Sequence, residues 1–269
     1  MTRVIALEYH DVVPAGDFAS SGFTGPGADS YKLTTASFDA HVTAVAATGS
    51  SAELPAEEVA ARMTGNGGEH GTRVIMTFDD GGRSALTEIA PRLEALGWCG
   101  HFFMTSGQIG APGFLDDSEL RELHARGHVI GSHSHSHPVR MSACTIDALR
   151  HEWTESVRLL SDILGAPVRT ASVPGGYFSR VVAETAADAG IRVLFTSEPT
   201  SRPMRVGSCT VLGRYTLRRD DPGSLAAALV ADAHGARVRQ WSIWNAKKVL
   251  KALGGESYLR ARARVFGSS

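Results

Sequence analysis

The stretch at residues 74–82 constrains the fold more than any other part of the sequence. The apolar run Val-Ile-Met-Thr-Phe ends abruptly in Asp79, Asp80 and two glycines. A short apolar run bounded by turn-forming residues is typical of a buried strand. The predicted strand therefore carries two carboxylates at its carboxyl end. Taken alone, the two aspartates are equally compatible with a simple turn that caps the following helix.

A second strand with a polar end lies downstream, at residues 127–138. Its short apolar run leads into His133, His135 and His137. Two neutral imidazoles and one carboxylate form a ligand set that holds a divalent metal ion and leaves coordination positions open. For this segment alone, a solvated histidine-rich loop is the alternative. Two strand ends with complementary ligands favour a metal site formed by Asp80, His133 and His137.

Strand and helix patterns alternate along the rest of the chain. Apolar strands are predicted at residues 4–10, 74–78, 100–105, 128–132 and 192–196, and a strand broken by Pro and Gly is predicted at residues 170–177. Helical periodicity is found between them, at residues 84–96, 115–126, 153–164 and 179–189. Connections this short imply parallel strands with covering helices. We expect a distorted (β/α) barrel of six or seven parallel strands with outer helices.

The composition fits one large α/β domain. A chain of 269 residues with 43% hydrophobic residues can bury a substantial core, and a formal net charge of −1 gives no reason to expect nucleic acid as a partner. The first apolar run is too short for a signal peptide, and three widely spaced cysteines provide no disulfide framework. We expect a cytoplasmic protein without a transmembrane segment, with the barrel at residues 1–222 and a helical tail packed on it at residues 223–269.

The two polar strand ends resemble the first two motifs of the polysaccharide deacetylase superfamily, also called the nodulation-factor deacetylase homology domain. The motifs are Thr77-Phe78-Asp79-Asp80-Gly81 and His133-Ser134-His135-Ser136-His137-Pro138, in the family's order and spacing. The resemblance covers roughly residues 1–220. It implies that Asp79 is the general base and that Asp80, His133 and His137 hold a divalent ion, with Zn²⁺ expected. By the same resemblance, His135 points away from the ion.

The third family motif is altered in this chain. The family has Arg-x-Pro-x-Gly, whereas residues 172–176 read Ser-Val-Pro-Gly-Gly. Serine thus replaces the arginine that pairs with the base. Asp79 should therefore be less firmly oriented, unless Arg169 or Arg214 reaches the same carboxylate from another direction. The residues expected to bind substrate are Pro174, Gly175, Gly176, Tyr177 and Arg214.

The family's closing motif, which supplies a histidine to protonate the leaving amine, is not visible. General acid assistance of this kind contributes about 10²–10⁴-fold to the rate. After residue 151 the only histidine is His234, whose position before a glycine is typical of a helix end. We expect His10 to act as the acid, because parallel barrel strands end on one face. The alternative is that His10 only closes a turn.

These features predict a metal-dependent deacetylase that hydrolyses an N-acetyl group from an amino sugar or a sugar-containing metabolite. One alternative is an amide hydrolase that acts on a small non-polymeric metabolite. The other is an inactive barrel that retains its metal ion and binds carbohydrate. Release of acetate from N-acetylated sugars distinguishes the first possibility from the last.

Overall fold

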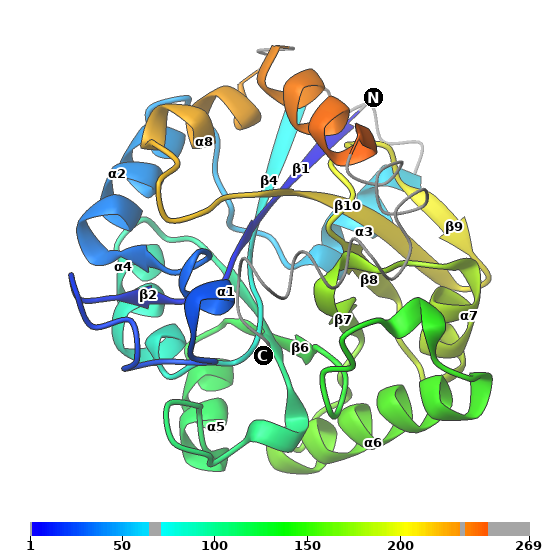
Figure 1. Cartoon of the computed structure of the whole chain (residues 1–269). Coiled ribbons are helices and arrows are strands. Elements are labelled where there is room, and N and C mark those ends of the chain that lie inside the picture. The colour runs from blue at the N-terminus through cyan, green and yellow to red at the C-terminus, as the bar shows by residue number, and fades with distance from the viewer. Residues whose placement is uncertain (1, 65–70, 232–234, 247–269) are drawn as a thin grey trace.

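Seven parallel strands form a closed barrel in the computed structural model, which describes residues 2–64, 71–231 and 235–246 (Figure 1). β10 pairs with β1, with Arg214 opposite Ala6, and this pairing closes the barrel. The predicted distorted (β/α) barrel is therefore confirmed. In order around the barrel, the strands are β1 (Thr2–Tyr9), β4 (Gly71–Phe78), β5 (Gly100–Met104), β6 (Val129–Ser132), β7 (Thr170–Ser172), β8 (Val193–Thr196) and β10 (Cys209–Thr216).

Three short strands lie outside the barrel wall. β9 (Met204–Val206) runs antiparallel to β10 at its outer edge. β2 (Val12–Val13) pairs with β3 (Leu33–Thr34), so the long glycine-rich loop between them begins and ends at the same place. This loop follows β1 and therefore lies at the end of the barrel where the polar residues gather.

Helices surround the barrel (Figure 1). They bury their apolar faces against the strands, and several begin at side chains that accept a hydrogen bond from the first turn, such as Thr34, Asp116, Thr145 and Ser179. The α-helices are α1 (Pro26–Asp29), α2 (Thr35–Ala46), α3 (Ala56–Thr64), α4 (Ala90–Glu94), α5 (Asp117–Ala125), α6 (Ile146–Leu164), α7 (Arg180–Asp188) and α8 (Gly223–Val230). Shorter turns of helix are η1 (Ala85–Ile89), η2 (Ser106–Gln108), η3 (Met141–Ala143) and η4 (Pro174–Gly176).

The interior of the barrel is filled by large apolar side chains. Phe103 and Phe195 are fully buried there, in one cluster with Val4 and Ala6 of β1 and Ile75 of β4. Because this interior is packed rather than hollow, polar groups gather only at the ends of the strands. The carboxyl ends of β1, β4, β6 and β7 carry the residues that the sequence analysis singled out.

The C-terminal part continues beyond the closed barrel. α8 packs against α2, and residues 235–246 form a further helix. Part of the predicted helical tail at residues 223–269 lies outside the described residues, and so does His234. The domain boundary at residue 222 stays a prediction. In the part of the chain that the structure describes, no helix has both the length and the apolar character needed to span a membrane.

Candidate active site

The three predicted metal ligands come together at the carboxyl ends of β4 and β6. Nε2 of His133 and Nε2 of His137 each lie 3.6 Å from Oδ1 of Asp80. One ligand atom from each of the three residues lies within 4.8 Å of the others. An arrangement of one carboxylate and two imidazoles around a single point fits a divalent ion.

The backbone around these ligands adopts conformations that non-glycine residues usually avoid. Asp80, Ser134 and His137 have φ angles of 77°, 66° and 56°. Each such residue costs about 1–2 kcal/mol, and strain of this kind concentrates at functional sites. Side-chain hydrogen bonds hold the histidine loop in place: the hydroxyl of Ser134 accepts from the backbone N–H of His137 (3.1 Å), and the carboxylate of Glu152 accepts from the N–H groups of residues 135 and 136.

Ser172 at the end of β7 orients His133. The hydroxyl of Ser172 donates to Oδ1 of Asp79 (3.0 Å), and the same oxygen lies 2.5 Å from Nδ1 of His133. Because the only proton of this hydroxyl points at Asp79, its oxygen accepts from the Nδ1–H of His133. Nε2 of His133 then carries the lone pair that faces Asp80, as a metal ligand requires.

The electrostatics of the three ligands also fit a cation. Burial lowers the pKa of His133 to about 3, so its imidazole is neutral at ordinary pH. Burial raises the pKa of Asp80, because little of its charge is compensated by protein groups. A divalent cation would supply the missing positive charge.

Asp79 is held by Arg214 on β10. Nη1 and Nη2 of the guanidinium each donate to a different oxygen of the Asp79 carboxylate, both at 2.7 Å. Burial acts to raise the pKa of Asp79, but the adjacent guanidinium of Arg214 outweighs it, so the pKa of this carboxyl lies well below its usual range. Asp79 is therefore ionised and fixed in orientation.

A second group of possible ligands adjoins the first. Glu8, His10 and Asp79 each have a ligand atom within 4.8 Å of the others. However, Nε of Arg214 lies 3.7 Å from Glu8, and its other nitrogens bind Asp79. Because a guanidinium already lies against both carboxylates and binds two oxygens of Asp79, this group is poorly suited to a second metal ion.

Comparisons with known proteins agree with this site. A family model described as polysaccharide deacetylase matches residues 66–194. YxkH of Bacillus subtilis (strain 168), whose name also places it among polysaccharide deacetylases, is 25% identical over 126 residues, which are 47% of this chain and 45% of YxkH. The alignment thus spans less than half the length of this curated relative.

Two solved structures share the fold. IcaB from Ammonifex degensii has a TM-score of 0.70 at 21% identity, covering 85% of this chain and 97% of that one. The Streptococcus pyogenes deacetylase PplD, solved in complex with acetate, has a TM-score of 0.67 at 18% identity, covering 82% and 95%. At these identities the likeness concerns the fold.

The segment matched by the family model contains both aspartates and both histidines of the site. Residues 66–194 are therefore similar in sequence to the polysaccharide deacetylase family. The resemblance inferred from the two sequence motifs is therefore confirmed. Arg214 and His10 lie outside the matched segment, so their places in the site come from the structure alone.

Arg214 on β10 occupies the place beside Asp79 that the resemblance assigns to the arginine of the third motif. Ser172 stands at the family's arginine position, and its hydroxyl contacts one oxygen of Asp79. Arg214, which was expected to bind substrate, is fully buried and directs its terminal nitrogens at Asp79 instead. Its contacts are therefore those of a group that positions the carboxylate.

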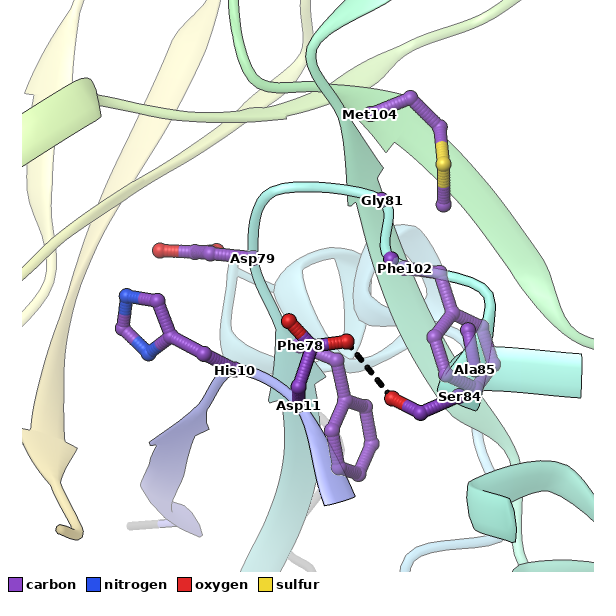
Figure 2. A pocket seen from close by; sticks show the side chains of 10 residues that line it. His10, Asp11, Phe78, Asp79, Gly81, Ser84, Ala85, Phe102 and Met104 are labelled. Atoms are coloured by element: carbon purple, nitrogen blue, oxygen red, sulfur yellow. Dashed lines mark hydrogen bonds between the residues drawn. The ribbon is translucent and has the colours of Figure 1, made fainter. Parts of the chain in front are cut away.

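His10 lies beside Asp79 at the end of β1. Figure 2 shows the two side chains projecting to the same side of the pocket, and their ligand atoms lie within 4.8 Å of each other. The ring of Tyr31 packs 4.7 Å from the imidazole. Among the described residues, Nδ1 of His10 has no hydrogen-bond partner although it is buried.

The remaining predicted residues occupy the rim. His135 turns away from the ligands, with Nδ1 3.0 Å from the hydroxyl of Ser106. Pro174, Gly175 and Gly176 form the η4 turn after β7, and Tyr177 ends it beneath the guanidinium of Arg140 (5.2 Å).

Sequence reasoning missed several residues that support the site. Glu8 is a buried carboxylate inside a strand, where it accepts from Ser197 (3.1 Å) and Thr216 (3.0 Å). Asp11 accepts from the hydroxyls of Ser21 (2.5 Å) and Ser84 (2.7 Å), and Figure 2 shows the second of these contacts. The signal available for Glu8 was a charged residue within an apolar strand. Asp11 offered no such signal, because in the sequence it resembles a turn residue.

Proposed function

We propose that this protein is a metal-dependent deacetylase that hydrolyses an N-acetyl group of an amino sugar or of a sugar-containing metabolite. One observation carries the proposal: an ionised Asp79, clamped by Arg214, lies next to the Asp80, His133 and His137 ligand set. The similarity of residues 66–194 to the polysaccharide deacetylase family supports the same chemistry. The substrate, the zinc ion and the cytoplasmic location are parts of this proposal.

Asp80, His133 and His137 would hold the metal ion. A bound divalent ion supplies Lewis acidity to water and to the carbonyl that is attacked. Ser172 keeps Nε2 of His133 free to serve as a ligand, and Glu152 holds the loop that carries His137. These contacts orient the ligands before the ion binds.

Asp79 acts as the base through Oδ2. Its Oδ1 is occupied by Arg214 and by the hydroxyl of Ser172, whereas Oδ2 accepts only from Arg214 among the hydrogen bonds of the described residues. Oδ2 also lies 3.9 Å from Nε2 of His133, on the side of the metal ligands. A lone pair is thus available there to take a proton from the attacking water. Arg214 contributes by positioning Asp79, and we reassign it from substrate binding to this role.

His10 is the proposed general acid. It adjoins Asp79, as the geometry of parallel strands requires. Nδ1 of His10 is buried and has no hydrogen-bond partner among the described residues, so it is free to contact the leaving amine. Pro174, Gly175, Gly176 and Tyr177 line the rim where the sugar would lie.

Acetate release tests the proposal. The metal-loaded protein should release acetate from N-acetylated sugars, and each ligand variant (Asp80→Ala, His133→Ala, His137→Ala) should lose metal and activity together. Asp79→Asn should keep the metal and lose activity by about 10²-fold or more. Binding of sugar without acetate release would instead support a carbohydrate-binding barrel, and release only from small non-sugar amides would support the amide hydrolase.

A further inference from the structure

The helix at residues 235–246 lies over the carboxyl end of the barrel, beside α8. It is the orange helix in Figure 1. The guanidinium of Arg237 donates to three backbone carbonyls at the end of α8, namely those of Leu229, Val230 and Ala231. The side chain of Gln240 donates to the carbonyl of Thr216 (2.9 Å), where β10 ends. These polar contacts attach the helix to the barrel.

Trp244 extends the same face of the helix. Residues 237, 240 and 244 follow the spacing i, i+3 and i+7, which places them on one side of an α-helix. Trp244 is half-buried, whereas Trp241 is 51% exposed. The chain therefore directs one of its two neighbouring tryptophans toward the rim of the barrel.

The indole of Trp244 lies against the turn after β7. A Cβ atom placed on Gly176 would come within 3.0 Å of Trp244 on one side and 3.0 Å of Ser197 on the other. Gly176 also has a φ of 68°, which favours glycine. On the neighbouring residue, a Cβ on Gly175 would lie 3.3 Å from the ring of Tyr177. Each of the two glycines thus lies close to one aromatic ring and carries no side chain that could cover it.

This turn adjoins the catalytic residues. Ser197, which lies close to Gly176 opposite Trp244, donates its hydroxyl to Glu8 (3.1 Å). Glu8 in turn lies 3.7 Å from the arginine that holds Asp79. Trp244 thus lies at the end of a series of neighbours that leads through Gly176, Ser197, Glu8 and Arg214 to the base. In the sequence it lies some fifty residues beyond the end of the family-model match at residue 194.

We propose that Trp244 forms one wall of the substrate site and packs against a pyranose ring of the N-acetylated amino sugar. A large flat aromatic surface with one polar N–H suits the apolar face of a sugar ring, and binding sites are commonly lined in this way. This inference rests on the proposed function, and it assigns part of substrate recognition to the C-terminal helix. The competing explanation is that Trp244 only fastens the helix to the barrel.

Two substitutions at one position separate these explanations. Trp244→Leu keeps an apolar side chain for packing but removes the flat ring, whereas Trp244→Phe keeps a ring. With the zinc-loaded full chain and the trimer of N-acetylglucosamine, Trp244→Leu should raise KM by roughly tenfold with little change in kcat, and Trp244→Phe should restore most of the affinity. Trp241→Leu, on the exposed side of the same helix, is the matched control and should leave KM unchanged.

Thermal unfolding of each variant measures packing separately. If Trp244→Leu lowers Tm but leaves KM unchanged while the wild type releases acetate, the inference is overturned and the proposed function stands. A fall in kcat without a rise in KM would overturn it as well.

If the wild type releases no acetate, the proposed function is refuted. A binding measurement then still tests the inference about Trp244. The dissociation constant of the same trimer is then compared between the Asp79→Asn protein and the Asp79→Asn, Trp244→Leu double variant. Weaker binding by the double variant would support the sugar contact. Equal binding, or no binding by either protein, would overturn it.

Discussion

Replacing Arg214 with methionine should both destabilise the protein and impair the base. Arg214 is fully buried, with two 2.7 Å contacts to Asp79 and a third nitrogen 3.7 Å from Glu8. Methionine fills similar space but leaves two buried carboxylates without their shared cation. Removing one partner of a buried ion pair typically costs about 3–5 kcal/mol, so we expect the free energy of unfolding to fall by about that amount.

The same change should alter the pH dependence of activity. Arg214 is the main influence that lowers the pKa of Asp79 against the effect of burial. Without it, the pKa of Asp79 rises, and the base becomes protonated at a higher pH. The acidic limb of the rate profile should therefore move to higher pH, and the rate on that limb should fall. Acetate release measured as a function of pH detects the shift.

A double-mutant cycle tests the physical reason for the effect. Asp79→Asn removes the charge that Arg214 compensates, so Arg214→Met should cost less in that background, with a coupling energy of about 1–3 kcal/mol. Urea unfolding of the four proteins measures the coupling. Arg180→Met is the control, because the side chain of Arg180 is 75% exposed and its ion pair with Glu184 should contribute less than about 1 kcal/mol. If the Arg214 and Asp79 substitutions are strictly additive and the acidic limb does not move, the positioning role is refuted.

Three further outcomes follow from the site. His135→Ala should retain the metal, since this ring faces Ser106 rather than the ligands, and loss of metal from this variant on elemental analysis would contradict the ligand assignment. If His10 is the acid, activity should fall as pH rises through its pKa and His10→Ala should abolish that alkaline limb; an unchanged pH–rate profile would remove His10 from the mechanism. The metal-free protein should lose about 2–3 kcal/mol of stability in urea unfolding when the pH falls from 7.5 to 5.5. Burial lowers the pKa of His133 to about 3 and that of His101 to about 4, whereas histidines of the unfolded chain take up protons near pH 6.5. The raised pKa of Asp80 partly offsets this loss. Stability that is flat or rising across this interval on acidification would show that these histidines are not buried in neutral form.

Most of the barrel was predictable from local patterns, but its closing strand was not. β10 was missed because Gly213 and Arg214 interrupt its apolar run, which resembles a loop when read alone. Arg214 is tolerated in the strand because it reaches the carboxylate of Asp79 across the barrel. Gly213 is needed because a Cβ atom at this position would lie 2.2 Å from the carbonyl oxygen of Glu198. Helix α6 was predicted to begin at residue 153 but begins at Ile146, after the capping hydroxyl of Thr145.

The sequence by itself determined which residue types would stand at the ends of two strands. Asp79 and Asp80 follow an apolar run directly, and His133 and His137 are only four residues apart, so short-range signals were sufficient to find them. Because parallel strands in a barrel end on one face, those signals also predicted that the aspartates and histidines would meet.

Only the tertiary structure decided what surrounds them. Arg214 lies 135 residues from Asp79 in the chain, and no local pattern records which carboxylate a distant guanidinium will bind. The role of the Ser172 hydroxyl follows from its simultaneous contacts with Asp79 and His133. The proposed role of Trp244 follows from its closeness to Gly176. Such contacts depend on how the strands close into a barrel, because closure brings side chains together that are separated by long stretches of chain.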